Sequence, residues 1–160
     1  MNLKALIGPI VAATLAGSAA MAETAPGEVV WVDDISIPVS LTGVAGNTEE
    51  GIRVMTTPAL GNCVACHEVG ALSNVPFHGN IGPALDGVGS RWSEAELRGI
   101  LVDAKHVFPE SRMPSFYRTE GFIRPGDRFT GRAADPATFG PLLTAQQIED
   151  TVAYLVTLTD

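Results

Sequence analysis

Two cysteines and a histidine share one short segment, Cys63-Val64-Ala65-Cys66-His67. This C-x-x-C-H spacing is the attachment signature of a c-type haem. Two thiols three residues apart match the two vinyl groups on one edge of a porphyrin, and the histidine that follows reaches beneath the ring to ligate the iron. The motif therefore predicts one covalently bound haem c, with Cys63 and Cys66 as attachment points and His67 as an axial ligand.

The cysteine pair has three other possible roles. A thioredoxin-like redox pair needs a βαβ context, and no alternation of strands and helices is visible here. A zinc site requires a second pair of ligands, whereas His78 and His106 stand apart and the chain holds only 2 Cys. A disulfide would leave His67 without a role. Only 3 of the 160 residues are histidine, so its position directly after Cys66 favours haem.

The second axial ligand must come from elsewhere in the chain. Met113 follows His67 by 46 residues, and the next residue, a proline, stiffens its loop. The surrounding sequence has no helical pattern, so core packing, the usual role of a buried methionine, does not account for it. Met55 falls in an expected helix and is better explained as core. We predict Met113, with His106 and His78 as alternatives; Met/His ligation raises the reduction potential and suits an electron acceptor.

Residues after the motif are expected to support the cofactor. Gly82 permits a close backbone approach, and the carbonyl of Pro83 is predicted to accept the Nδ1–H of His67 and to orient its ring. The alternative is an ordinary Gly-Pro turn. Arg91 and Trp92 are candidate donors to the haem propionates. For these two the alternative is a surface arginine and a core tryptophan.

Three segments carry the pattern of a helix start, in which a capping residue is followed three places later by Glu or Gln: residues 47–50, 93–96 and 144–147. They predict one helix that stops before Pro58, one that ends near His106, and one at the C-terminus. The C-terminal helix places its apolar residues on one face: Ile148, Val152 and Leu155.

The helices and the segments between them differ in composition. Gly51 in the first helix is predicted to admit Tyr154 of the last. Residues 23–46 carry β-type residues without helical periodicity and predict an extended arm, with one short strand as an option. Aromatic residues make up only 6% of the chain, and residues 68–90 and 109–142 are rich in Gly and Pro. We therefore expect a cofactor to be the centre on which these loops pack.

The N-terminus has the pattern of a secretory signal peptide. Lys4 is followed by 18 residues without charge, and the segment closes with Ala20-Met21-Ala22, a small-x-small cleavage pattern. The alternative is a membrane anchor, but 18 residues are at the lower limit for a span, and Pro9 interrupts the run. The expected organisation is a cleaved signal peptide (1–22), an extended arm (23–46) and one domain (47–160), exported to the periplasm, with no later membrane span.

The length and net charge of the chain limit the number of domains and the kinds of partner it can bind. A chain of 160 residues allows one domain of ordinary size. Its 10 Lys+Arg against 18 Asp+Glu give a net charge of -8, which argues against a nucleic-acid partner because no basic stripe is available to neutralise phosphates.

The chain resembles class I cytochromes c over about residues 47–158. The resemblance is carried by the helix before the haem motif, the motif itself, Gly82-Pro83-Ala84-Leu85 followed by Gly87-Val88, Met113-Pro114, and the last helix ending in Ala153-Tyr154-Leu155. It implies an all-α class I cytochrome c fold, with a few helices wrapped around one covalent haem. More narrowly, the segments 37–43, 61–62, 112–116 and 143–150 resemble the SoxX family, the monohaem subunits of the SoxAX cytochromes of periplasmic sulfur oxidation. A long insertion, residues 117–141, departs from compact class I cytochromes.

The narrower resemblance implies a role and partners. In that family a SoxA subunit carries the site at which thiosulfate is joined oxidatively to a cysteine of a SoxYZ carrier, and the X subunit relays the electrons to a small cytochrome. It implies the electron-transfer subunit of a heterodimeric L-cysteine S-thiosulfotransferase, with no catalytic residue in this chain. The contact with SoxA is expected at the haem edge, near Val64, Ala65 and residues 82–85.

Two other functions stay open at this point. One is a free-standing class I electron shuttle, which needs neither the arm at 23–46 nor the insertion at 117–141. The other is the haem subunit of a different periplasmic dehydrogenase.

Overall fold

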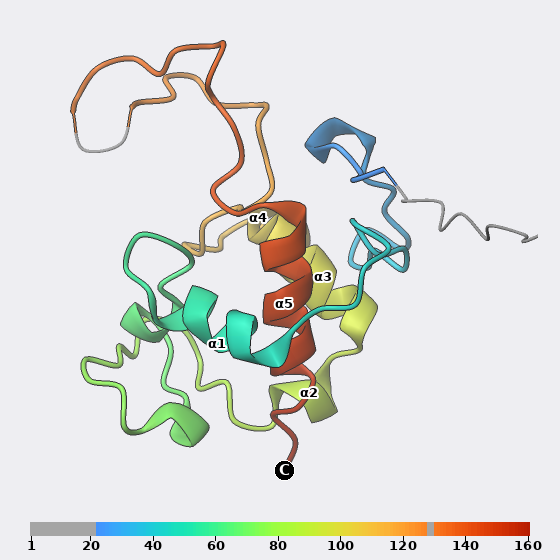
Figure 1. Ribbon diagram of the computed structural model, residues 1–160, viewed down its shortest axis with the longest axis vertical. Coiled ribbons are helices and arrows are strands. Elements are labelled where there is room, and N and C mark those ends of the chain that lie inside the picture. The colour runs from blue at the N-terminus through green and yellow to red at the C-terminus, as the bar shows by residue number, and fades with distance from the viewer. Residues whose placement is uncertain (1–21, 128–129) are drawn as a thin grey trace, which may run out of the picture.

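The computed structural model describes residues 22–127 and 130–160, and its regular structure is helical (Figure 1). The α-helices are α1 (Thr48–Thr56), α2 (Val88–Arg91), α3 (Glu94–Val102), α4 (Ala104–Val107) and α5 (Ala145–Leu155). Short 3-10 helices cover Pro26–Glu28, Cys63–Ala65 and Gly70–Leu72. The all-α expectation is confirmed. The optional strand in the arm is reduced to an isolated bridge between Val32 and Ser36.

The first and last helices cross at close range and form the centre of the fold (Figure 1). At the crossing, a Cβ atom on Gly51 would lie 2.2 Å from the carbonyl oxygen of Asp150 and 3.0 Å from the Cβ of Tyr154. The expected approach of Tyr154 is therefore present, but the tightest contact is with the backbone of α5. Around the crossing, apolar side chains of α1, α3 and α5 form one buried cluster that includes Val54, Met55, Leu97, Leu101, Ile148 and Val152.

Two of the three capping boxes that the sequence predicts are complete in the structure. Ser93 and Thr144 form complete capping boxes with Glu96 and Gln147. Asn47 caps α1 with its side chain, but the Glu50 carboxylate pairs with Arg53 at 2.6 Å instead of returning to the cap.

The helix expected over residues 93–106 is two helices, because Asp103 leaves the helical conformation and caps α4. Its side chain accepts from the backbone N–H groups of Lys105 and His106.

The N-terminal arm is part of the folded body. Ile37 and Leu41 are 2% and 1% exposed within the main apolar cluster. The Tyr117 hydroxyl donates to Glu23 Oε1 at 3.0 Å and to the Thr24 carbonyl at 2.8 Å. The expected signal peptide, residues 1–22, lies outside the described residues except for Ala22.

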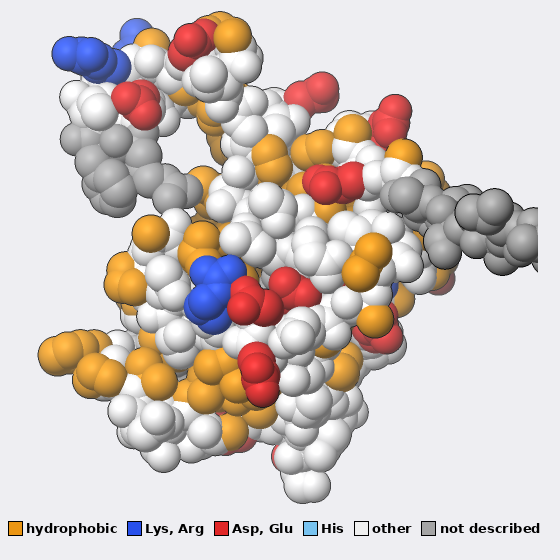
Figure 2. Space-filling view, in the orientation of Figure 1, with side chains coloured by type: hydrophobic (Ala, Val, Ile, Leu, Met, Phe, Trp, Pro, Cys, Tyr) orange, Lys and Arg blue, Asp and Glu red, His pale blue; other side chains and the backbone are white. Residues whose placement is uncertain are grey.

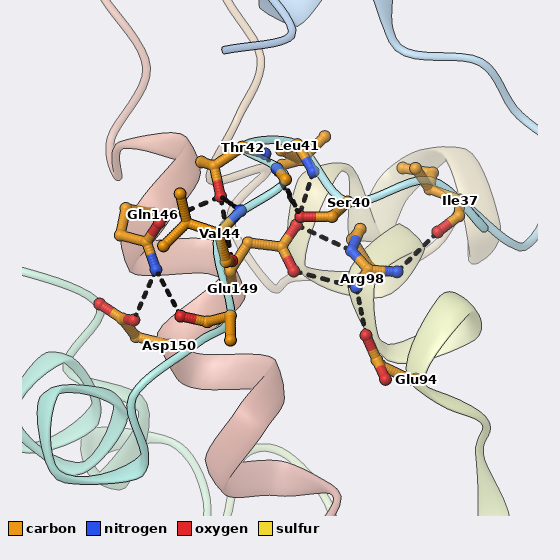
Figure 3. A network of polar contacts seen from close by, with 12 residues as sticks. Ile37, Ser40, Leu41, Thr42, Val44, Glu94, Arg98, Gln146, Glu149 and Asp150 are labelled. Atoms are coloured by element: carbon orange, nitrogen blue, oxygen red, sulfur yellow. Dashed lines mark hydrogen bonds and ion pairs between the residues drawn. The ribbon is translucent and has the colours of Figure 1, made fainter. Parts of the chain in front are cut away.

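A buried ion pair ties the arm to two helices (Figure 3). Arg98 of α3 is 2% exposed and donates to both carboxylate oxygens of Glu149 of α5, each at 2.9 Å. The same guanidinium donates to the carbonyl of Ile37 at 2.8 Å, and Glu149 accepts from the N–H of Leu41 at 2.7 Å. Burial lowers the pKa of Arg98, but the hydrogen bonds and charge of Glu149 and Glu94 outweigh it and raise that pKa, so Arg98 stays charged.

The insertion, residues 117–141, projects from the helical body as a loop (Figure 1). It begins after Tyr117, whose N–H donates to the Val102 carbonyl, and returns at Leu143, whose N–H donates to the Phe116 carbonyl. Within the described residues, none of the helices is long and apolar enough to cross a membrane.

Replacing Gly51 with alanine is expected to destabilise the fold by about 2 kcal/mol. Alanine favours an isolated helix by about 1 kcal/mol, but its methyl group would overlap the Asp150 carbonyl at the α1–α5 crossing. Thermal unfolding of the holoprotein measures the effect. Gly140→Ala is the matched control, because a Cβ there meets nothing within 4 Å. Equal melting temperatures for the two variants would contradict the close crossing.

Candidate functional site

The C-x-x-C-H segment forms one tight turn, which a short loop separates from the end of α1. The backbone N–H groups of Cys66 and His67 both donate to the carbonyl of Cys63, at 3.0 and 2.9 Å. The two thiols are not joined to each other. Burial raises the pKa of the Cys63 thiol to about 12, with a smaller contribution from the neighbouring Cys66 thiol. The turn thus gathers both thiols and the imidazole within five consecutive residues.

The ring of His67 is held by the segment that follows the motif. Its Nδ1 lies 2.7 Å from the carbonyl oxygen of Pro83, which is the hydrogen bond expected from the sequence. The Gly82 N–H donates to the Cys66 carbonyl at 2.8 Å, and a Cβ on Gly82 would lie 2.2 Å from Cε1 of His67. Only glycine leaves room for the ring. With Nδ1–H donating to Pro83, Nε2 keeps its lone pair, which is the donor that an iron ion requires.

A second contact fixes the same segment against the motif. The Gly79 N–H donates to the Val64 carbonyl at 2.8 Å, and a Cβ on Gly79 would lie 2.1 Å from the Ala65 carbonyl oxygen. The neighbouring His78 accepts from the Val69 N–H at 3.2 Å through Nδ1, so its proton is on Nε2. That nitrogen is buried, and the described residues provide no acceptor for it. Two thiols and an oriented imidazole are the chemistry that a haem c site requires.

Met113 lies in a loop that is anchored to the junction of α3 and α4. Its N–H donates to Ser111 Oγ at 3.2 Å, and its carbonyl accepts from Lys105 Nζ at 2.6 Å. The Ser115 hydroxyl donates to Asp103 Oδ1 at 2.5 Å. The Met113 side chain is partly buried against the apolar cluster. Sequence reasoning missed Asp103 and Lys105; the signal was an aspartate directly before Ala104-Lys105, typical of a helix cap.

The alternative axial ligands are engaged in other contacts. Met55 is 0% exposed within the core of α1, as expected for a packing residue. The His106 ring stacks on Trp31 of the arm, with ring centroids 4.2 Å apart. In the described part of the chain, no group of three or more His, Cys, Asp or Glu side chains has the arrangement of a metal site.

Arg91 and Trp92 have contacts of their own. Arg91 donates to the carbonyls of Asp86 at 2.7 Å and Ala84 at 3.2 Å, and so braces the chain just after Pro83. Trp92 packs edge-on against Phe108, with ring centroids 6.0 Å apart. The expectation that either residue contacts a haem propionate stays a prediction.

Apolar side chains are exposed beside the C-x-x-C-H turn. Ala65 is exposed, and Phe77 and Ile81, which flank the Gly79 contact, are 91% and 72% exposed. Phe77 has a φ of 68°, in the left-handed region that bulky residues avoid. Hydrophobic side chains project from the left edge in Figure 2. Val64, which the sequence places near the contact with SoxA, is 4% exposed and packs into the core, so it is not part of the exposed surface.

Comparison with known proteins agrees with this fold and site. The family model described as Cytochrome c matches residues 49–159. The chain therefore belongs to the cytochrome c family, whose members are haem electron-transfer proteins, and its cofactor is a covalently bound haem c.

The narrower resemblance is also confirmed. A chain of the crystal structure of SoxXA from P. pantotrophus is 57% identical, with a TM-score of 0.83; the match covers 87% of this chain and 100% of that one. The similarity supports the resemblance to the SoxX family. Among curated proteins, no sequence matches.

Proposed function

We propose that this chain is the monohaem subunit of a SoxAX-type heterodimer in the periplasm. It accepts electrons from a SoxA-like subunit while thiosulfate is joined to a cysteine of a SoxYZ-type carrier, and it relays them to a small cytochrome. The observation that carries the proposal is the 57% identity to a SoxXA chain along that chain's full length, together with the C-x-x-C-H turn. Export by a cleaved signal peptide, residues 1–22, belongs to the proposal; N-terminal sequencing of the periplasmic protein tests it.

Each residue of the site has a distinct role in this proposal. Cys63 and Cys66 would hold haem c covalently, and His67 and Met113 would ligate its iron. Bound haem c supplies one-electron redox chemistry at a potential that its ligands set. Pro83 orients His67 through the 2.7 Å contact, and Lys105 holds the Met113 backbone. No catalytic acid, base or nucleophile is assigned to this chain, so bond formation to thiosulfate belongs to the partner.

Met113→Ala is expected to remove the sulfur-to-iron charge-transfer band at the red end of the visible spectrum and to lower the reduction potential, because a thioether favours Fe(II). Absorption spectroscopy of the oxidised holoprotein measures the first effect and potentiometry the second. Met55→Leu is the control, since Met55 is a fully buried core residue. Retention of the band in Met113→Ala, or its loss in Met55→Leu, would show that Met113 is not the ligand.

The partner surface is assigned to the exposed apolar patch formed by Ala65, Phe77 and Ile81. An apolar patch beside the attachment turn, on a chain of net charge -8, is typical of a protein interface. We expect Ala65→Glu to weaken the heterodimer by about tenfold or more, because it buries an unpaired charge. Size-exclusion chromatography with the reconstituted SoxA-like subunit measures the complex.

The matched control for this experiment is Val39→Glu, which places the same charge on an exposed apolar residue of the arm, at a distance in sequence from the patch. An intact complex with Ala65→Glu and an unchanged haem spectrum would locate the interface elsewhere. A chain that never forms a pair with a SoxA-like subunit would favour the free electron shuttle.

A further inference from the structure

The basic residues of this acidic chain are unevenly distributed. Six of the 10 Lys+Arg fall between residues 105 and 132, together with only three of the 18 Asp+Glu. That segment therefore carries a positive net charge within a chain of net charge -8. Figure 2 shows Lys and Arg side chains at the end of the projecting loop, where acidic side chains also lie, and both kinds of charge on the rest of that face.

A pocket of about 510 Å³ lies where the base of this loop meets α4. Its cationic lining residues are Lys105, Arg118 and Arg124, and none of its lining residues is acidic. Phe122, Phe139 and Leu142 form its apolar wall. We call it the basic pocket.

The three cationic side chains of the basic pocket differ in how many of their hydrogen-bond donors already have partners. The ammonium group of Lys105 has three N–H donors, and one of them donates to the Met113 carbonyl. Arg118 pairs with Asp103 at 3.2 Å and lies over the ring of Phe122, with its guanidinium carbon 5.6 Å from the centroid. Arg124 is exposed and has no hydrogen bond or ion pair within the described residues. The pocket thus retains unused donors next to the loop that carries Met113.

We propose that the basic pocket binds a carboxylate-rich segment of a partner polypeptide. This inference deepens the proposed electron-transfer function and rests on it, because such a partner would dock on the Met113 side rather than at the C-x-x-C-H edge. Charge complementarity selects an acidic partner and speeds its approach. The pocket volume is more than ten times that of one water, about 30 Å³, so a small oxyanion alone would leave its apolar wall wet.

Apolar exposure near the pocket also favours a polypeptide. Ile123, between two of its lining residues, is 97% exposed, and Phe122 is 47% exposed. A peptide with carboxylates and an apolar side chain would cover both kinds of surface, whereas an inorganic anion would contact the cations alone.

The test titrates the oxidised holoprotein, without any SoxA-like subunit, with a synthetic oligoglutamate peptide that contains leucine, and follows binding by calorimetry. The expected result is salt-dependent binding that Arg124→Glu weakens by about tenfold or more. Arg53→Glu is the matched control: it makes the same change of charge on an exposed residue of α1, and it is expected to weaken binding less than about twofold. Unchanged haem spectra and melting temperatures show that both variants fold.

Three results would overturn the proposal: no binding of the peptide, equal losses for the two variants, or displacement of the peptide by inorganic sulfate at constant ionic strength. The last would identify a small-anion site instead. Since the assay omits the SoxA-like subunit, its failure is distinct from a failure to form the heterodimer.

Discussion

A variant with both Cys63 and Cys66 replaced by serine is expected to carry no haem after denaturation. Serine hydroxyls do not form the thioether bonds, so nothing covalent holds the cofactor. Staining of a denaturing gel for haem peroxidase activity measures the loss. Each single variant keeps one thiol and is expected to give a reduced yield of holoprotein.

The same variants are expected to lose stability, because the native state loses the packing and iron ligation that an attached haem supplies only when the chain is folded. The chain between α1 and α2, residues 57–87, has only two short 3-10 helices, and the Gly79 and Gly82 N–H groups connect its second half to the motif. Thermal melting followed by circular dichroism tests this expectation. A haem-free variant that melts cooperatively at the holoprotein temperature would refute it. Thr57→Ser, a mild hydroxyl-conserving change in the same region, is the expression control.

Arg98→Met is expected to destabilise the protein by about 3–5 kcal/mol, the usual result of removing one partner of a buried ion pair. It leaves the Glu149 carboxylate buried without its bidentate donor and the Ile37 carbonyl without its partner. Denaturant unfolding of the holoprotein measures the change. The loss should be largest in contacts of the arm, which hydrogen exchange at Leu41 reports.

The exposed pair Arg53–Glu50 provides the matched control for Arg98. Its side chains are 53% and 48% exposed, so Arg53→Met is expected to cost less than about 1 kcal/mol. The double variant Arg98→Met/Glu149→Leu removes both charges and is expected to be less destabilised than Arg98→Met alone. Equal costs for Arg98→Met and Arg53→Met would mean that burial does not determine the strength of the pair.

Local signals in the sequence predicted the helices where a cap and an apolar face coincide. Ser93 and Thr144 illustrate this, since their capping boxes form as written. The break at Asp103 was missed because the apolar pattern continues through it, while the Ser115 and Arg118 partners that stabilise the break lie 12 and 15 residues further along. Such long-range contacts cannot be predicted from the periodicity of apolar residues along the sequence.

The site shows the same division. The C-x-x-C-H motif and the Pro83 contact with His67 were predictable because covalent spacing and ring geometry demand particular residues. The exposure of Phe77 and the burial of Val64 were not, because one turn of the backbone decides which apolar side chain faces the core. The Lys105 contact with the Met113 carbonyl likewise depends on how a loop returns to a helix.

The crossing of α1 with α5 has a consequence for the order of events during folding. Residues 57–144, 88 in number, separate the two helices, so their contact forms late, after a large loop has closed. Until α5 docks, α1 lacks its main packing partner. Cys63, which packs against the main apolar cluster in the folded protein, remains accessible during that time. The topology thus leaves an interval in which haem can reach the thiols before the chain closes over them.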